Sequence, residues 1–309
     1  MKLRIGTRGS KLALTQTSMV IAAINSIDQE IETETVIIKT KGDLILDKSL
    51  DKIGDKGLFV AEIEEQLRQG YIDMAIHSMK DLPSEDSCEF LIFPVLKRED
   101  PRDVLVTKHS ISSIYELPDH AIIGTGSKRR KAQIETLLPT ATVVPIRGNV
   151  ETRIEKMIQQ DMDGTILAAA GINRLAIKST DSFTIIPFNI NQMVPAPGQG
   201  ILACQIMQNN KSIEAIAKAL IDQSTYLEAV TERAFLKAVG GGCHIPLGAY
   251  LEKQSDIIKF HYLFGDENCE KIIKGTIDVK NNIDCKVLEK KLIKKAIELA
   301  QYAVAEVEG

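Results

Sequence analysis

Short apolar runs alternate with segments of helical spacing along most of the chain. We place strands at residues 3–7, 33–40 and 71–79. Between them, one helix is expected to follow Ser10 as its cap, and a second carries Phe59, Ile63 and Leu67 and ends at Gly70. Alternation of this kind is typical of parallel βαβ units, so it predicts an α/β lobe.

The alternation resumes in a second stretch, with strands expected at 122–125, 142–146 and 165–170. Two charged or proline-rich joints, at 98–103 and 195–200, flank this stretch. The strand at 201–207 is expected to return to the first lobe. Two doubly wound α/β lobes with two crossings predict the arrangement of periplasmic binding proteins, with a hinge and a ligand cleft.

The pattern changes after Lys211 to helices and then to antiparallel strands. Thr225-x-x-Glu228 has the form of a capping box. Residues 258–264 alternate as a half-buried strand, 272–279 could pair with it, and 292–300 are amphipathic. We therefore expect a small α+β C-terminal domain. The predicted domains are residues 1–97 with 198–212 (domain 1, with a lid loop at 41–57), 98–197 (domain 2) and 213–309 (domain 3).

Composition narrows the class of protein. Of the 309 residues, 44% are hydrophobic and 26% charged, which is typical of a globular protein with more than one core. Five cysteines without a C-x-x-C indicate neither a disulfide frame nor a zinc site, and we expect no metal. The net charge of −4 argues against a nucleic-acid partner. No apolar run approaches a membrane span and no export signal precedes residue 3, so a cytoplasmic location without membrane contact is expected.

A glycine-rich turn displays a cysteine. Gly240, Gly241 and Gly242 precede Cys243, and only one glycine is needed to end the preceding helix. The extra glycines allow a bulky group to approach the main chain closely, and an ionised thiol is a strong nucleophile. A half-buried cysteine on a flexible turn is the alternative, and the local sequence leaves both open.

Arginines recur where parallel strands end and helices begin. The set comprises Arg8, Arg129, Arg130, Arg147, Arg153 and Arg174. Their planar forks suit carboxylates or phosphates, helix N-termini add N–H donors, and Ser10, Ser78, Thr125 and Ser127 could add hydroxyls. Solvated surface arginines are the alternative for each one alone. Their recurrence at one kind of location favours a polyanionic small ligand.

Asp81 follows Lys80 at the end of the third expected strand. A carboxylate there can stabilise a cationic intermediate or move a proton. Asp81-Leu82-Pro83 is also favourable turn chemistry, so a capping role is equally open. The neighbouring His77 lies in an apolar strand and is expected to be a structural histidine with satisfied polar atoms.

Taken together, these segments resemble the porphobilinogen deaminase family, also called hydroxymethylbilane synthases. The resemblance runs through nearly the whole chain, and its motifs occur in the family's order. They are Ile5-Gly6-Thr7-Arg8-Gly9-Ser10, Lys41-Gly42-Asp43, Lys56-Gly57-Leu58-Phe59, His77-Ser78-Met79-Lys80-Asp81-Leu82-Pro83, Arg98-Glu99-Asp100-Pro101-Arg102-Asp103, Arg147-Gly148-Asn149-Val150, Gly198-Gln199-Gly200 and Gly241-Gly242-Cys243. Gly9, Gly126 and Lys128 depart from the residues common in relatives.

The resemblance implies a transferase of tetrapyrrole and heme biosynthesis. Such enzymes join four porphobilinogens head to tail with loss of ammonia and hydrolyse off hydroxymethylbilane, which passes to uroporphyrinogen-III synthase. A dipyrromethane cofactor, bound as a thioether to the cysteine matching Cys243, primes the chain. The resemblance also implies a monomer.

The same resemblance implies the roles of individual residues, with Asp81 as the catalytic residue. Besides Cys243, the implied cofactor-binding residues are Ser78, Lys80, Asp81, Thr125, Ser127, Arg129, Arg130, Arg147 and Gly171. The implied substrate-binding residues are Arg8, Ser10, Gln16, Phe59, Arg147, Arg153, Arg174 and Gln199.

Two rival functions stay open at this point. A non-catalytic, hinged small-anion-binding protein would use the same lobes and arginines, but it would not need Cys243 or a third domain. A transferase that uses the cysteine as nucleophile would need a base near the thiol, and adjacent His244 is the one available in sequence.

Overall fold

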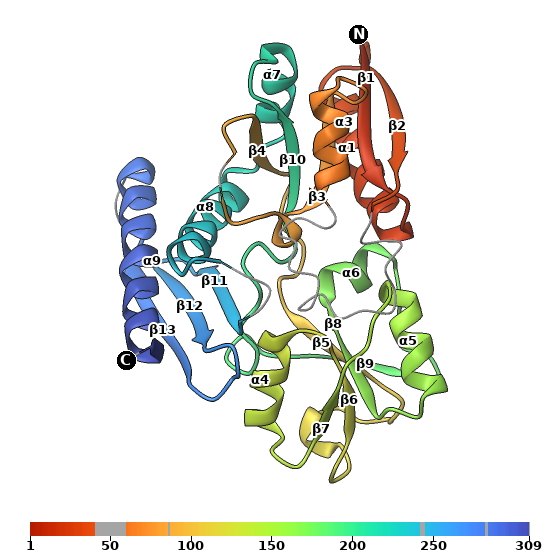
Figure 1. Ribbon diagram of the computed structural model, residues 1–309, viewed down its shortest axis with the longest axis vertical. Coiled ribbons are helices and arrows are strands. Elements are labelled where there is room, and N and C mark those ends of the chain that lie inside the picture. Colours follow the sequence, from red (N-terminus) through yellow and green to blue (C-terminus); the bar gives the residue numbers. More distant parts are fainter. Residues whose placement is uncertain (41–59, 86, 242–244, 282–283, 309) are drawn as a thin grey trace. The chain divides into compact units, whose positions relative to one another are not determined.

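The computed structural model describes residues 1–40, 60–85, 87–241, 245–281 and 284–308 (Figure 1). These form two compact units, unit 1 from Met1–Glu99 with Gly200–Ala229, and unit 2 from Asp100–Gln199 with Val230–Gly309. Each unit therefore combines two separate stretches of the chain. The expected lid loop at 41–57, Phe59 and Cys243 lie outside the described residues.

Unit 1 contains a five-stranded sheet. Its strands are β1 (Lys2–Arg8), β2 (Glu32–Ile38), β3 (Met74–Ser78), β4 (Phe90–Val95) and β10 (Leu202–Met207), in the order β2-β1-β3-β10-β4. β1 runs parallel to β2 and β3, whereas β10 is antiparallel to both of its neighbours. The strand that follows the second joint, β10, lies in the same sheet as β1, so the predicted return of the chain to the first lobe is confirmed. The sheet is mixed rather than wholly parallel, because β10 enters it from the opposite end.

Helices cover both faces of this sheet. Helices α1 (Lys11–Ile27) and α7 (Lys211–Ala219) share one apolar core with β1, and α3 (Ala61–Arg68) packs on the other face through Ile63 and Leu67. In α7, Ile213 and Ala217 belong to the same core as Ile5. This helix therefore lies with the first sheet, although the sequence analysis began domain 3 at residue 213. The three-domain division stays a prediction.

The first sheet of unit 2 repeats this strand order. Its strands are β5 (Asp103–Thr107), β6 (Ile122–Gly124), β7 (Thr142–Val144), β8 (Gly164–Ala168) and β9 (Thr184–Pro187), in the order β7-β6-β8-β5-β9. Here β5 is the antiparallel strand. Its helices are α4 (Lys128–Leu137), α5 (Val150–Gln159) and α6 (Ala169–Arg174). Ile134 of α4 packs on one face and Met157 of α5 on the other. Two such lobes confirm the predicted fold class.

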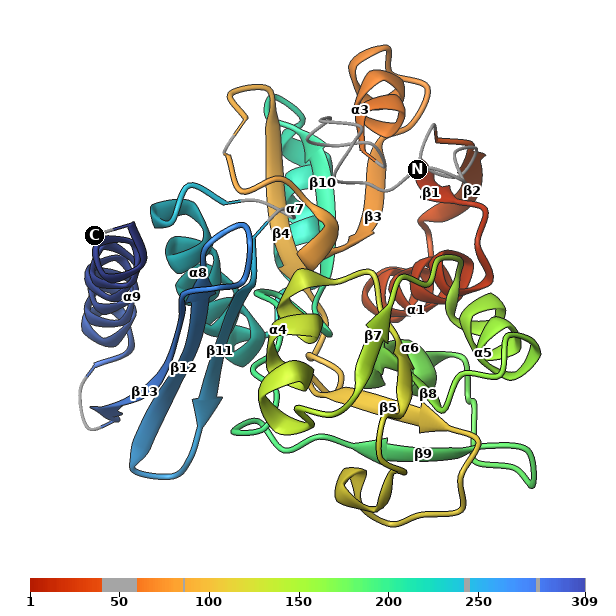
Figure 2. The ribbon, with the colours of Figure 1, turned by 60° about the horizontal axis from the view of Figure 1, so that its bottom comes forward.

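The rest of unit 2 is the expected small α+β part (Figure 2). Strands β11 (Leu247–Lys253), β12 (Ile257–Gly265) and β13 (Ile272–Lys280) form an antiparallel sheet, and α9 (Cys285–Glu308) packs along β12 and β13. The part of helix α8 (Gln223–Ala238) that belongs to unit 2, from Val230 on, places Phe235 against Phe260 and Tyr262. The hinge and cleft stay a prediction.

The predicted capping box at Thr225 was wrong. Helix α8 begins at Gln223, and the Asp222 carboxylate accepts the N–H of Thr225 at 2.8 Å. Thr225 is buried inside the helix, where its hydroxyl accepts the N–H of Arg98 at 2.9 Å. The Asp222 carboxylate, three residues earlier, occupies the capping position instead of the Thr225 hydroxyl.

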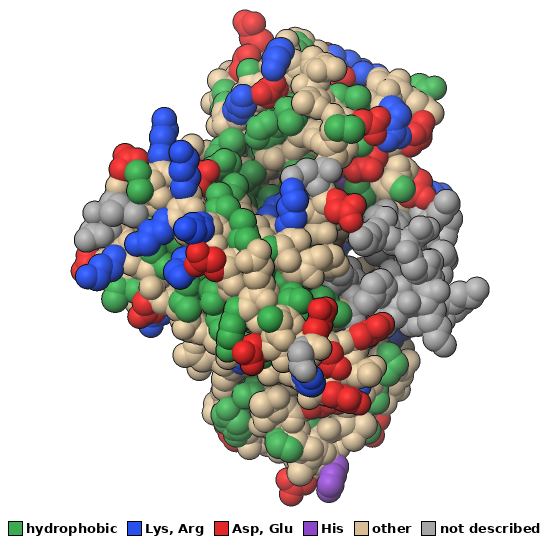
Figure 3. Space-filling model, turned by 60° about the vertical axis from the view of Figure 1, so that its left-hand side comes forward, with side chains coloured by type: hydrophobic (Ala, Val, Ile, Leu, Met, Phe, Trp, Pro, Cys, Tyr) green, Lys and Arg blue, Asp and Glu red, His purple; other side chains and the backbone are tan. Residues whose placement is uncertain are grey.

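The surface is mixed in charge on the face that Figure 3 draws, where basic and acidic side chains are interspersed. Among the described residues, no helix combines the length and apolarity that crossing a bilayer requires. Within the same residues, no three side chains of His, Cys, Asp or Glu gather as metal ligands.

Candidate active site

The predicted residues of unit 2 gather at one edge of its first sheet. Strands β6, β7 and β8 run parallel, so their carboxyl ends share an edge. Shortly after these ends come Thr125 and Ser127, then Arg147, and then Gly171. The sheet topology thus brings together residues that lie far apart in sequence. Arg174 ends α6, six residues after β8, and so does not lie at the helix start where the sequence placed it.

Two hydroxyls shape the start of α4 at this edge. The Thr125 hydroxyl accepts the N–H of Ser127 at 3.2 Å. The Ser127 hydroxyl then caps α4 by accepting the N–H of Arg130. The capped turn points its remaining N–H groups and the positive end of the helix dipole at the edge. Its chemistry therefore favours an anion.

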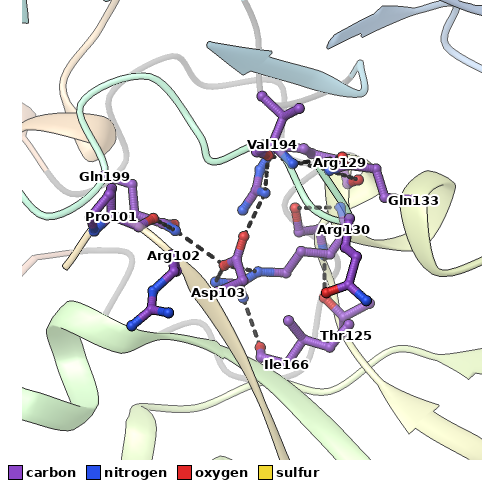
Figure 4. A network of polar contacts seen from close by, with 12 residues as sticks. Pro101, Arg102, Asp103, Thr125, Arg129, Arg130, Gln133, Ile166, Val194 and Gln199 are labelled. Carbon is purple, nitrogen blue, oxygen red and sulfur yellow. Dashed lines mark hydrogen bonds and ion pairs between the residues drawn. The ribbon is translucent and has the colours of Figure 1, made fainter. Parts of the chain in front are cut away.

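Arg129 and Arg130 extend from this turn to one buried carboxylate, that of Asp103 (Figure 4). Arg129 donates from Nη1 to Asp103 Oδ2 at 2.7 Å, and Arg130 donates from Nε and Nη2 to Oδ1 at 3.0 and 2.8 Å. The Asp103 side chain is 0% exposed, and both arginines are 5% exposed. The sequence analysis expected ligand-facing arginines, and here they form a buried ion-paired cluster.

The charge of this cluster does not cancel. Burial lowers the pKa of Arg130 and the Arg129 charge adds to that effect, while Asp103 opposes it. Arginine nevertheless stays protonated in proteins. Two guanidinium groups and one carboxylate leave one excess positive charge, so the cluster can still attract an anion.

Contacts with the Val194 carbonyl and with the Gln199 side chain tie the cluster to the second joint and to the residue before it. Arg129 Nη1 also donates to the carbonyl of Val194 at 2.7 Å, and the Gln199 amide donates to Asp103 Oδ1 at 3.2 Å and to the Pro101 carbonyl at 2.7 Å. Gln199 is 0% exposed. Its predicted role as a substrate ligand stays a prediction, and its described contacts are with the joints.

The buried carboxylate of Glu232 holds Gly198, the residue of the second joint that precedes Gln199. Glu232 of α8 accepts the N–H of Gly198 at 2.7 Å and the N–H of Leu251 at 3.0 Å. Leu251 lies in β11, the strand that follows the segment with Cys243. The strand after the candidate nucleophile is therefore held to the same joint as the arginine cluster.

The turn after β7 presents Arg147 at the edge. Gly148 has a φ of +126°, and its carbonyl accepts from Arg153 Nε at 2.8 Å. Lys156 donates to the Arg147 carbonyl at 3.1 Å, and Asn149 caps α5. Arg153 thus supports the backbone beside Arg147, and both side chains are half-buried.

The predicted residues of unit 1 gather around the ends of β1 and β3, which are parallel neighbours. Gln16 of α1 donates to the Ser78 hydroxyl at 3.0 Å, and Ser10 caps α1 by accepting the N–H of Ala13. Arg8 ends β1 and is half-buried. Like the sheet edge of unit 2, this part of unit 1 therefore combines a helix N-terminus, hydroxyl groups and an arginine.

Lys80 and Asp81 follow β3 in the short 3₁₀ helix η2 (Met79–Asp81). The N–H of Met79 donates to the Ile201 carbonyl at 3.0 Å, which fixes η2 against the chain that leads into β10. Asp81 is an exposed residue. His77, by contrast, is buried, as a structural histidine was expected to be, and burial lowers its pKa to about 4. Its Nε2 has no hydrogen-bond partner among the described residues, so the expectation that its polar atoms are satisfied was wrong.

Comparison with known proteins decides the family. Residues 3–215 match the family model described as "Porphobilinogen deaminase, dipyromethane cofactor binding domain", and residues 226–299 match "Porphobilinogen deaminase, C-terminal domain". The chain belongs to the porphobilinogen deaminase family.

Curated porphobilinogen deaminases are similar over nearly the whole chain. That of Clostridium novyi (strain NT) is 50% identical over 280 residues, which cover 91% of this chain and 93% of the relative. That of Clostridioides difficile (strain 630) is 48% identical and covers 90% and 91%. Among solved structures, the BenM effector binding domain with its effector benzoate is 12% identical, with a TM-score of 0.42, covering 71% of this chain and 90% of that one.

In this member of the porphobilinogen deaminase family, sequence alone did not single out Asp103 as part of the site. A signal existed, since an acidic residue leads directly into the apolar run Val104-Leu105-Val106 of a buried strand. A carboxylate buried there needs a cationic partner. The partners lie 26 and 27 residues away, so the sequence did not identify them.

Proposed function

We propose that this chain joins four porphobilinogens head to tail onto a covalently bound dipyrromethane primer, releases ammonia, and frees hydroxymethylbilane by hydrolysis. The match of residues 3–215 to the dipyrromethane-binding domain of the family carries this proposal. Transfer of a pyrrolylmethyl group makes the protein a transferase of porphyrin and heme biosynthesis.

The donor set of unit 2 fits a dipyrromethane. Each of its rings carries carboxylate side chains, and Arg129 with Arg130 has one positive charge in excess over Asp103. The start of α4 adds N–H donors, and charge-assisted hydrogen bonds to carboxylates are among the strongest in proteins. When bound, the dipyrromethane supplies the nucleophilic pyrrole carbon to which substrate is added.

We assign its ligands by the family match. Cys243 would hold it as a thioether, and the non-covalent ligands would be Ser78, Lys80, Asp81, Thr125, Ser127, Arg129, Arg130, Arg147 and Gly171. Arg8, Ser10, Gln16, Phe59, Arg147, Arg153, Arg174 and Gln199 would bind the substrate.

Asp81 is the proposed catalytic residue. Loss of ammonia from porphobilinogen leaves an electron-poor cation, and a carboxylate beside the pyrrole nitrogens stabilises that charge and can accept a proton. The exposed position of Asp81 on η2 leaves it accessible to a ligand.

The mass of freshly purified, active protein tests the proposal. We expect an adduct equal to one dipyrromethane, absent from Cys243→Ala, where the thiol is lost. Asp81→Asn should keep the adduct and lose about 100- to 1000-fold in turnover. An active protein without the adduct would contradict the deaminase function. A non-catalytic anion binder would show neither adduct nor turnover.

Family membership also supports proposals about the enzyme that receives the product, the oligomeric state and the cellular location. The product would pass to uroporphyrinogen-III synthase, the protein would act as a monomer, and the reaction would take place in the cytoplasm. Sedimentation of the loaded protein tests the monomer directly.

A further inference from the structure

We propose that Asp103 is a positioning residue, which holds the guanidinium groups of Arg129 and Arg130 in the orientation that receives a ligand carboxylate. The inference rests on the proposed function, because it takes the arginine pair as part of the dipyrromethane site. Asp103 itself would contact neither the cofactor nor the substrate.

The backbone of Asp103 is fixed on both sides. It is the first residue of β5, which lies between β8 and β9 in the sheet. Asp103 pairs with Ala168 of β8, and its carbonyl accepts the N–H of Phe188 at 3.0 Å. The Asp103 carboxylate is therefore attached to a rigid strand, and a side chain that orients other side chains requires such a support.

The carboxylate and two carbonyls together fix both arginine side chains. Arg130 directs Nε and Nη2 to Asp103 Oδ1 and Nη1 to the Ile166 carbonyl at 2.8 Å, so opposite sides of its planar fork are held. Arg129 shares its Nη1 between Asp103 Oδ2 and the Val194 carbonyl. Figure 4 shows both side chains converging on Asp103 from the start of α4.

The two possible roles of Asp103, reducing the positive charge of the cluster or positioning its arginines, predict opposite effects of Asp103→Asn on anion binding. Asp103 cancels one of two positive charges, so Asp103→Asn would raise the net charge of the cluster from +1 to +2 and should strengthen anion binding. Positioning predicts weaker binding. Without the carboxylate, two buried guanidinium groups repel each other and lose their shared acceptor, so their orientations are no longer fixed. The sign of the change separates the two roles.

The experiment measures how fast apoprotein loads its cofactor when porphobilinogen is added, by intact mass over time. We expect Asp103→Asn to load at least tenfold more slowly than wild type, and Asp103→Glu, which keeps the charge, to recover part of that loss. Asp163→Asn is the matched control. It removes a carboxylate of the same unit, one that accepts the Ile122 N–H at 2.8 Å and contacts His109, away from the arginine pair.

A folded Asp103→Asn protein that loads as fast as wild type, or faster, overturns the inference. If Asp103→Asn does not fold, Asp103→Glu decides. Its carboxylate is displaced by one carbon, so slower loading supports positioning and wild-type loading overturns it. Asp163→Asn should load normally, and equal slowing there would assign the effect to general destabilisation and also overturn the inference. Absence of the adduct from wild type would instead contradict the proposed function.

Discussion

At the scale of single residues, long-range partners decide what a charged side chain does. Arg4 of β1 pairs with Asp73 through two side-chain hydrogen bonds of 3.0 and 2.8 Å and a backbone bond of 2.8 Å. Burial by itself raises the pKa of Asp73, but these contacts with Arg4 outweigh it and hold the pKa below its ordinary value. The ionised carboxylate is therefore favoured by folding.

This pair predicts a pH-dependent loss of stability. Asp73→Asn should lower the free energy of unfolding by about 1 kcal/mol at pH 7, because it removes a charged acceptor of a bidentate pair. Because the pKa of Asp73 is lower in the folded than in the unfolded protein, the pair stabilises the fold fully at pH values above the unfolded-state pKa of about 3.9. This contribution to stability is lost as the pH falls through the folded-state pKa. The difference between variant and wild type should thus shrink below about pH 4.

Urea unfolding at several pH values measures this difference. The exposed Asp119 provides the comparison, and Asp119→Asn should follow wild type throughout. A deficit in Asp73→Asn that stayed constant down to pH 2 would show that side-chain shape, rather than charge, holds the pair together.

At the residue scale, the sequence predicted that hydroxyls and cations follow the strand ends, but it did not predict which groups these side chains contact. Ser10, Ser127 and Asn149 cap helices at strand ends, as local spacing allows one to infer. The burial of Arg129 and Arg130 against Asp103 depends on strand order, which spacing does not contain. The roles of these arginines as ligands stay predictions.

At the scale of elements, periodicity predicted strands as short as the three-residue β6 and β7, whereas the five-residue β5 was not predicted. The strands β1, β2 and β3 and the helices α1 and α3 lie where periodicity indicated them, within a few residues. The sequence analysis did not predict β4 or β9. Each carries a proline, Pro94 or Pro187, and each lies at a sheet edge, where a missing N–H is tolerated. Strand order depends on long-range pairing, so the sequence did not show that these two segments lie at sheet edges.

The turn between β7 and α5 gives a prediction at this scale. A Cβ at Gly148 would lie 2.7 Å from Thr152 Cγ2, in a backbone conformation with positive φ. Gly148→Ala should therefore destabilise unit 2 by about 1–3 kcal/mol. Gly126→Ala is the matched control, since its Cβ would lie 3.5 Å from the nearest atom, the Ile146 carbonyl oxygen, and it should change stability by less than about 0.5 kcal/mol.

Thermal unfolding of the two variants measures the comparison. Because Gly148 supports Arg147, cofactor loading should also slow in Gly148→Ala. Equal melting temperatures for the two variants would mean that the turn adjusts without strain.

At the scale of the molecule, the two lobes share one strand order without a visible sequence repeat. In each sheet the antiparallel strand, β10 or β5, is the first strand after the chain crosses from the other unit. The sequence predicted the return at 201–207, but not that β10 lies between β3 and β4. Insertion between two earlier strands is a long-range pairing that no local pattern encodes.

This topology predicts how truncated chains behave. A fragment of residues 1–199 lacks β10, the neighbour through which β4 joins the sheet, so β4 should be unprotected in hydrogen exchange. A fragment of residues 1–229 retains both stretches of unit 1 and should protect β4. Protection of residues 90–95 in the shorter fragment would contradict the dependence of β4 on β10.

The late arrival of β10 has a consequence for synthesis on the ribosome. At roughly 5–20 residues per second, the interval between the emergence of β4 and that of β10 is on the order of ten seconds. During that time the apolar edges of β3 and β4 stay open to wrong partners. A nascent-chain chaperone that shields these edges would therefore be needed most while the second lobe is still being translated.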